Sequence, residues 1–290
     1  MDNQKKRIRA QFEELDSLPP LPQTAKKILQ LRSSPNQNIK NLAKIIELDP
    51  SLSAQVVRYA KSSLYGYQGH IANVEAAIAR VLGYDTVLNL ALSLATTKPF
   101  SIPRKGPLGA EAFWRRAVYS AVLSQSLTHI IPKEVNISTS MAYLAGLLHE
   151  IGILAIADIQ PKIFKELNRT DEETGSPLIQ RERQFLAITH AEAGARLLRH
   201  WGLPDEIIIA TLKCGTPRFN GIHAEYALLI YLANTLMNAN QAPEETIAHC
   251  PECTQIISFL GVSTINVVNI FNQVSTNLTD VDTMARRLAA

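Results

Sequence analysis

The sequence predicts an all-α fold, built as a two-lobed helical bundle. Apolar residues recur at helical spacing along nearly the whole chain, and no run longer than a few residues alternates apolar and polar positions as a half-buried strand does. Glycine and proline are scarce, with 13 and 15 among 290 residues, whereas folds rich in strands and turns use more of both. Apolar residues make up 46% of the chain, which is enough for a sizeable core and excludes a disordered chain.

The first lobe is predicted to contain a series of short helices. Asp49-Pro50 interrupts the first apolar pattern, and proline suits the first turn of a new helix. Asn73 has the side chain of an N-cap, and Gly83 suits the position just after a helix end. Helical spacing covers residues 39–46, 52–63, 74–82 and 85–95.

A segment rich in proline and glycine divides the chain. Residues 98–109, with the sequence KPFSIPRKGPLG, hold three prolines and two glycines, so we place the boundary between the lobes near residues 98–110. Beyond it, residues 138–158 are apolar on nearly all sides, which predicts one helix at the centre of the bundle. Thr189 and Glu192 have the spacing of a capping box. Further helices are predicted at residues 111–130, 189–202 and 223–238.

The two ends of the chain and its apolar runs predict a cytoplasmic protein that does not enter a membrane. Residues 1–14 form a charged extension without the apolar region of a signal peptide. The longest apolar run, residues 141–157, contains a His-Glu pair and is shorter than the roughly 20 residues that a membrane span needs. Three cysteines are too few to cross-link a chain of this size. Residues 241–290 carry no motif, and we expect a C-terminal helical extension there.

His149 and Glu150 lie within the most apolar segment. A buried charge is costly unless it is paired or bound to a metal, so this pair is a candidate for metal ligands. The alternative is a core histidine that is hydrogen-bonded to a neighbouring carbonyl group. His190 follows the capping box, where the helix dipole disfavours an imidazolium and predicts the neutral ring that a metal binds. The alternative for His190 is an exposed side chain at a helix start.

Two further segments have patterns related to zinc binding and to DNA binding. Cys250-Pro-Glu-Cys253 lacks the second pair of a zinc ribbon, since Cys214 is the one cysteine left. Residues 41–61 have the pattern of a helix–turn–helix, but the acidic side chain of Asp49 in the turn opposes contact with phosphate. With a net charge of only +3, we do not expect a nucleic-acid partner. The polar residues that the second helix of this pair would present are Ser51, Ser53, Gln55, Arg58 and Lys61.

Nine short motifs then occur in one order along the chain. They are LPPLP at 18–22, IIELDP at 45–50, YAKSSLYG at 59–66, AAIARVLG at 76–83, NLALS at 89–93, FWR at 113–115, AGLLHEIG at 145–152, HAEAG at 190–194 and WGLP at 201–204. On these motifs, residues 15–240 resemble the HDOD family, the HD-related output domains. The resemblance implies an all-α fold related to the HD phosphohydrolases and a bacterial regulatory role.

The resemblance also implies where a phosphohydrolase site would lie and how it has changed. An active HD enzyme holds metal ions that generate a hydroxide nucleophile and neutralise phosphoryl oxygens. Arg116 stands where the first histidine ligand would be, and a guanidinium neither deprotonates nor ligates. We expect Arg116 to pair with Glu150, while Asn234 lacks the charge of the last aspartate ligand. The six positions of this vestigial site are Arg116, His149, Glu150, His190, Cys214 and Asn234.

The predicted function follows from this degenerate site. We expect a non-catalytic signal-transduction module that acts through protein–protein contacts, with no catalytic residue, cofactor or metal. The implied partners are signalling proteins of response-regulator or cyclic-di-nucleotide pathways, and the oligomeric state stays open. One alternative is a residual metal-dependent nucleotide phosphohydrolase or phosphodiesterase that uses His149, Glu150 and His190. Others are a DNA-binding regulator that uses residues 41–61, and a small ligand or anion held against Arg116.

Overall fold

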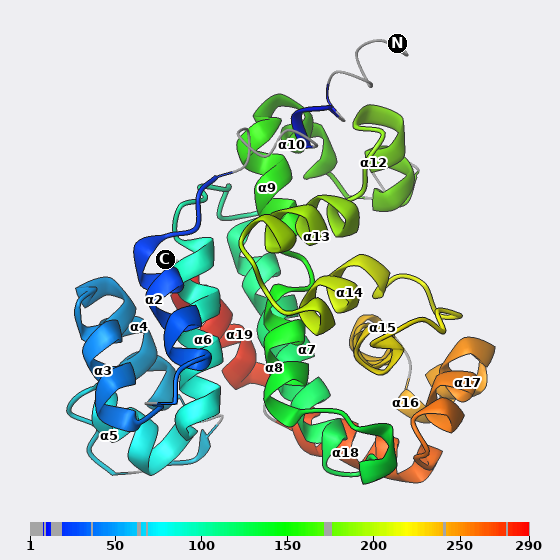
Figure 1. The fold of residues 1–290 in the computed structure, drawn as a ribbon. Helices are drawn as coiled ribbons and strands as arrows, with labels where there is room; N and C mark the ends of the chain where they lie inside the picture. Colours follow the sequence, from blue (N-terminus) through cyan, green and yellow to red (C-terminus); the bar gives the residue numbers. More distant parts are fainter. Residues whose placement is uncertain are drawn as a thin grey trace.

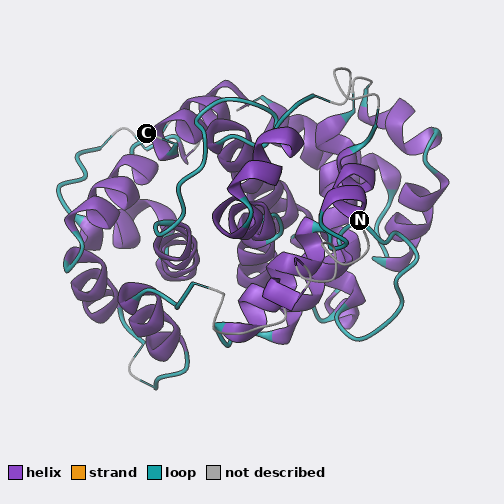
Figure 2. Ribbon diagram, turned by 90° about the horizontal axis from the view of Figure 1, so that it is seen from above, coloured by secondary structure: helices purple, strands orange, loops and turns teal. Residues whose placement is uncertain are grey.

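The computed structural model describes residues 8, 10–12, 19–35, 37–62, 65–67, 69–170, 176–239, 242–276 and 278–289. Within these residues every regular element is a helix and none is a strand, which confirms the predicted fold class (Figure 2). The charged extension expected at residues 1–14 lies mostly outside the described part. Two of its apolar residues, Ile8 and Phe12, are nonetheless buried in the core.

The first lobe is formed by the helices before residue 98 (Figure 1). Asp49 caps its third helix by accepting from Ser51 and Leu52, and Asn73 caps the next by accepting from Ala76, as the sequence predicts. Gly83 has a φ of 76°, the left-handed region that favours glycine. The elements are α2 (Gln23–Arg32), α3 (Ile39–Glu47), α4 (Pro50–Ala60), α5 (Val74–Ala77), the π-helix η3 (Ile78–Leu82) and α6 (Tyr84–Thr97).

The second lobe begins after residues 98–109, which contain no helix. Its helices are α7 (Ala110–Thr128), the 3₁₀ turn η4 (Lys133–Val135), α8 (Thr139–Leu148), α9 (Ile151–Ile159), α10 (Pro161–Leu167), α12 (Leu178–Phe185), α13 (His190–His200), α14 (Asp205–Lys213) and α15 (Ala224–Asn238). The capping box is present: Thr189 Oγ1 accepts from the Glu192 N–H, and the Glu192 carboxylate accepts from the Thr189 N–H. In Figure 1, α7 and α8 run together through the middle of the molecule.

The prediction of a single helix over residues 138–158 is wrong in one respect. The structure divides it into α8 and α9, with a turn at His149 and Glu150. A local cause is the backbone of Glu150, whose φ of −105° and ψ of 12° depart from helical values. The turn aims the two side chains differently, so that His149 is buried while Glu150 reaches a partly exposed position.

The α8–α9 segment is the part of the described chain that most resembles a membrane span by length and composition. Thr139–Ile159 meets both criteria, and 89% of its apolar window is buried inside the protein. The helices α17 (Pro251–Phe259) and α18 (Thr264–Ser275) are long and apolar enough only when they are taken together, and the angle between them is 100°. Burial among helices on all sides is the environment of a core segment, as the sequence predicts for residues 138–158.

The lobes are joined by buried polar contacts as well as by apolar ones. The Tyr59 hydroxyl on α4 and the Tyr143 hydroxyl on α8 lie 2.7 Å apart in a buried hydrogen bond. On α6, the Asn89 amide donates to the Ser140 carbonyl at 2.8 Å. Because buried hydrogen bonds are costly to break, these contacts hold the two lobes in one arrangement.

The C-terminal segment is helical where it is described, and its last helix returns to the middle of the molecule. After α16 (Pro243–Ala248), α17 and α18, the helix α19 (Leu278–Leu288) packs along α7, as the red ribbon in Figure 1 shows. Its apolar face, formed by Val281, Met284 and Ala285, is buried. Arg115 on α7 pairs with Asp282 at 2.6 Å. Residues 241–290 therefore contribute to the core.

Candidate functional site

The six vestigial-site residues come from five places in the chain. Arg116 lies on α7, His149 and Glu150 at the α8–α9 turn, and His190 at the first position of α13. Cys214 directly follows α14, and Asn234 lies on α15. The structure brings Arg116, His149, Glu150 and His190 close enough for their charges to affect one another's ionisation, and the charge of Glu150 also acts on Cys214.

Arg116 and Glu150 form the ion pair that the sequence predicts. Arg116 Nε donates to Glu150 Oε2 at 2.6 Å, and Nη1 donates to the Pro107 carbonyl at 2.8 Å in the segment between the lobes. The side chains are 19% and 15% exposed, so the pair is partly buried and does not lie in the interior. Burial alone would raise the pKa of Glu150, but the charges of Arg116, His149 and His190, with the Arg116 hydrogen bond, together lower that pKa below its ordinary value. Glu150 is therefore a carboxylate already neutralised by a cation.

His149 is a buried, neutral imidazole with one free nitrogen. Its Nδ1 lies 2.8 Å from the Gly146 carbonyl, so Nδ1 carries the proton and donates. Nε2 is enclosed and has no protein partner. Burial lowers the pKa of His149, against the opposing effects of the Glu150 charge and the Gly146 carbonyl. The hydrogen bond to the Gly146 carbonyl is the one expected of a histidine in the core. A histidine that binds a metal usually makes the same kind of hydrogen bond with its second nitrogen, so this contact fits both interpretations.

His190 differs from its prediction because a buried carboxylate faces it. Glu182 Oε1 lies 2.8 Å from His190 Nδ1, and Glu182 Oε2 accepts from the His190 backbone N–H at 3.2 Å. Burial lowers the pKa of His190, but the hydrogen bond and charge of Glu182, with the charge of Glu150, raise it overall above its ordinary value. The helix dipole alone predicts a lowered pKa, whereas the carboxylate in direct contact shifts the pKa of His190 in the opposite direction. The side chain is also 13% exposed, which removes the alternative of an exposed histidine.

Cys214 and Asn234 contribute no charge to the site. Burial, with a smaller effect of the Glu150 charge, raises the pKa of Cys214 to about 12, so its thiol stays protonated at neutral pH. Asn234 is half-buried, and its Oδ1 is enclosed without a protein partner. Neither side chain therefore supplies the anionic donor that a divalent metal prefers in these positions.

Sequence reasoning missed Glu182 and its neighbour Arg181. Both lie on α12 and are buried, with 1% and 4% exposure. Arg181 donates to the carbonyl groups of Ser176 and Leu167, which fixes the start of α12 against the end of α10. In the sequence, the two residues stand in a run of polar residues, QRERQ, that is typical of a solvated helix. The spacing of Glu182 eight residues before His190 carries no recognisable signal, because a loop separates them.

The residues present do not fit the metal centre of an HD phosphohydrolase. Within the described part of the chain, no three His, Cys, Asp or Glu side chains gather as metal ligands would. Glu150 already accepts from a guanidinium, and the imidazole of His190 is engaged by Glu182. A second positive charge beside Arg116 would be repelled. A bound anion would also find few free donors on Arg116. Its Nε and Nη1 already donate to Glu150 and Pro107, and its Nη2 is enclosed.

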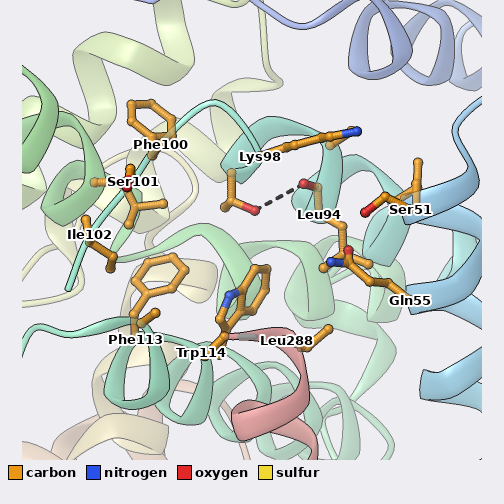
Figure 3. A pocket seen from close by; sticks show the side chains of 16 residues that line it. Ser51, Gln55, Leu94, Lys98, Phe100, Ser101, Ile102, Phe113, Trp114 and Leu288 are labelled. Carbon is orange, nitrogen blue, oxygen red and sulfur yellow. Dashed lines mark hydrogen bonds between the residues drawn. The ribbon is translucent and has the colours of Figure 1, made fainter. Parts of the chain in front are cut away.

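A separate cavity of about 320 Å³ lies between the lobes (Figure 3). Phe100, Phe113 and Trp114 form part of its wall, and none of the six vestigial-site residues lines it. Gln55, on the second helix of the pair suggested for DNA binding, lines the same cavity, as does Leu288 of α19. Gln55 thus faces another part of this chain.

Removal of the Arg116 guanidinium gives the first stability prediction. Arg116→Ala leaves Glu150 without its cation, and we expect a loss of about 2 kcal/mol in the free energy of unfolding, between the values for exposed and buried pairs. In a double-mutant cycle with Glu150→Gln, the loss of stability in the double variant should be smaller than the sum of the two single losses by about 1 kcal/mol. Urea titrations measure both quantities.

The neighbouring Arg115 provides the matched control. Its ion pair with Asp282 has the same 2.6 Å separation, but the side chains are 46% and 41% exposed. Arg115→Ala should therefore cost only about 0–1 kcal/mol. Equal losses for Arg115→Ala and Arg116→Ala would contradict the role given to the Arg116–Glu150 pair.

His149 gives a prediction about pH. Because its folded-state pKa is lowered, the unfolded state binds the proton first as the pH falls below about 6.5. The stability that the neutral ring contributes is therefore full above that pH and is lost toward lower pH. Between pH 7.5 and 5.5, urea titrations should show a smaller loss of stability in His149→Asn than in the parent, by about 1 kcal/mol. Parallel losses in the two proteins would show that His149 titrates normally.

Comparisons with known proteins agree on one fold. The HDOD domain family model matches residues 18–216 of the chain. A solved structure from Marinobacter aquaeolei VT8, named for signal transduction, is 31% identical with a TM-score of 0.83, over 99% of this chain and 66% of that one. A protein of Shewanella amazonensis SB2B, named as a phosphohydrolase, has a TM-score of 0.75 at 19% identity, over 96% of this chain and 97% of that one. At that identity the second match shows the fold alone.

This chain spans only part of the length of the curated relatives that it matches. An uncharacterized protein of Treponema pallidum (strain Nichols) is 22% identical over 67% of this chain, which spans 37% of that protein.

Proposed function

This chain belongs to the HDOD domain family, and we propose that it is a regulatory module which does not hydrolyse phosphate esters and acts through contacts with other proteins. The observation that carries the proposal is the 2.6 Å ion pair between Arg116 and Glu150. In this family's fold relatives that are enzymes, metal ions supply the nucleophile and neutralise the phosphoryl group. Here a fixed cation has taken the carboxylate, and a guanidinium cannot generate a hydroxide nucleophile.

Two other findings support a signalling role. The relative named for signal transduction is 31% identical and shares the fold over nearly all of this chain. The burial of the α8–α9 segment in the bundle supports a cytoplasmic domain. The proposed partners are proteins of response-regulator or cyclic-di-nucleotide pathways, which the family resemblance implies.

A turnover assay separates this proposal from the residual phosphohydrolase. The purified chain is incubated with Mn²⁺, Fe²⁺ or Mg²⁺ and with p-nitrophenyl phosphate, bis(p-nitrophenyl) phosphate and cyclic dinucleotides. We expect product at the rate of the protein-free control, and the same rate for His149→Ala. Metal-dependent turnover that is lost in His149→Ala would establish the enzyme and overturn the proposal.

A further inference from the structure

The Cys250-Pro-Glu-Cys253 motif lies at the N-terminus of α17, far along the chain from the vestigial site. Cys250 is the N-cap residue, Pro251 is the first helical residue, and Cys253 occupies the third helical position. Cys250 is half-buried and Cys253 is fully buried. Cys250 Sγ accepts a hydrogen bond from the Cys253 N–H, so the two cysteines share the first turn of the helix.

Helix capping does not account for a cysteine at this position. The Cys253 N–H donates to Cys250 Sγ at 3.2 Å, but sulfur is a weak acceptor compared with an oxygen. Six other helices in the described chain are capped by oxygen: Asn38, Asp49, Asn73, Ser138, Thr189 and Ser263 fill this role. A serine would serve α17 better as a cap. The placement of two cysteines three residues apart therefore needs a reason in sulfur chemistry.

Zinc does not supply that reason. Within the described residues no third or fourth donor joins the pair. The nearest histidine in the sequence, His249, directs Nδ1 to the carbonyl group of Glu245 at 2.9 Å. A structural zinc needs four ligands, so the pair is left with the chemistry of two adjacent thiols.

We propose that Cys250 and Cys253 form a thiol–disulfide exchange site, which a low-molecular-weight disulfide oxidises to an intramolecular disulfide. Neighbours on a helix three residues apart have Cβ atoms about 5–6 Å apart, within reach of a disulfide after a small adjustment of the first turn.

The order of the two steps follows from exposure. The half-buried Cys250 thiolate attacks one sulfur of the disulfide RSSR, forming Cys250–S–S–R and releasing RS⁻. Cys253 then loses its proton and attacks Cys250 Sγ, which forms the internal disulfide and releases the second RS⁻. Two thiols of the protein are oxidised and one disulfide RSSR is reduced to two RS⁻, which take up the two protons that the protein thiols have lost. Burial and the contact with Cys250 raise the pKa of Cys253 to about 12, so it is the resolving thiol and not the attacking one.

This site is in contact with the helix that carries Asn234. The side chain of Thr235 on α15, the residue that follows Asn234, lies close enough to Cys253 to affect the pKa of its thiol. Oxidation of Cys253 therefore changes the surroundings of α15. The proposal does not depend on the absence of hydrolysis, and either can fail without the other.

The test uses the whole chain in buffers of reduced and oxidised glutathione at graded ratios. Free thiols are alkylated after denaturation, counted by mass spectrometry and located in peptides. We expect the oxidised protein to lose two of its three thiols, with a peptide containing Cys250 and Cys253 lighter by two hydrogen atoms and with Cys214 still alkylated. Cys214→Ser should give the same product, whereas Cys253→Ser should stop at a mixed disulfide with glutathione on Cys250.

Two results would overturn the proposal. One is retention of all three thiols at every ratio that oxidises a dithiol control peptide. The other is a stable glutathione adduct on Cys250 in the parent chain, since this would show that Cys253 does not resolve it.

Discussion

Replacement of Gly152 by alanine is expected to give the largest loss of stability, about 3 kcal/mol or more. A Cβ atom on Gly152 would lie 1.9 Å from the His190 carbonyl oxygen and 2.5 Å from the Gly194 nitrogen. Both atoms belong to the backbone of α13, so no side chain can rotate away, and the two helices must separate. Overpacking at a close backbone contact costs at the upper end of the range for core substitutions. Urea denaturation measures the loss.

The consequence should extend to the site, because α9 and α13 carry its residues on either side of this contact. Separation of the helices moves His190 away from the α8–α9 turn, and we expect altered imidazole signals of His149 and His190 in NMR spectra. Gly215→Ala is the matched control, since a Cβ there meets no atom within 4 Å. Its stability should stay within about 0.5 kcal/mol of the parent. A similarly small change for Gly152→Ala would mean that the two helices do not approach as closely as described.

Glu182→Ala is expected to give the second large loss, about 3–5 kcal/mol. The substitution leaves two buried donors of His190, the backbone N–H and the Nδ1–H, without their acceptor. Glu182→Gln keeps the shape of the side chain but removes its charge, so it should lower the pKa of His190. Urea titration measures the first effect, and NMR titration of the imidazole measures the second.

The dependence of this effect on pH has a definite sign. Because the folded-state pKa of His190 is raised, the imidazolium–carboxylate pair contributes fully below about pH 6.5, and this contribution is lost as the pH rises through the folded-state pKa. The stability difference between the parent and Glu182→Gln should therefore narrow toward alkaline pH. The exposed Glu166, whose partner Arg169 is 3.5 Å away, serves as the control, and Glu166→Ala should cost about 0–1 kcal/mol. A pH-independent difference would mean that Glu182 does not face a titrating histidine.

The features that the sequence could predict are those fixed within a few residues. Asn73 and Thr189 cap helices through bonds to residues three positions away, so their patterns are visible in the sequence. Gly83 takes the positive φ that marks a helix end. The turn between α8 and α9 could not be predicted in this way, because the sequence on both sides of His149 and Glu150 is apolar and the close contact of Gly152 with α13 joins residues 38 positions apart or more.

For the site, local pattern and resemblance contributed differently. Only the family resemblance linked Arg116 to Glu150, 34 positions away in the sequence. Neither local pattern nor family resemblance pointed to Glu182. In the sequence, a buried carboxylate within a run of polar residues cannot be distinguished from an exposed one. The contact of Glu182 with His190 raises the pKa of that imidazole, the direction opposite to the one that the helix dipole alone predicts.

The metal content of the purified chain tests most directly whether Arg116 has replaced the metal ions of the HD site. The protein is incubated with excess Mn²⁺ or Fe²⁺, desalted, and analysed for metal together with a His149→Ala variant. Because Glu150 is paired with a fixed cation, we expect well below one metal ion per chain in both proteins. About two ions per chain in the parent, as a two-metal site requires, and their loss in His149→Ala, would contradict a site closed by Arg116.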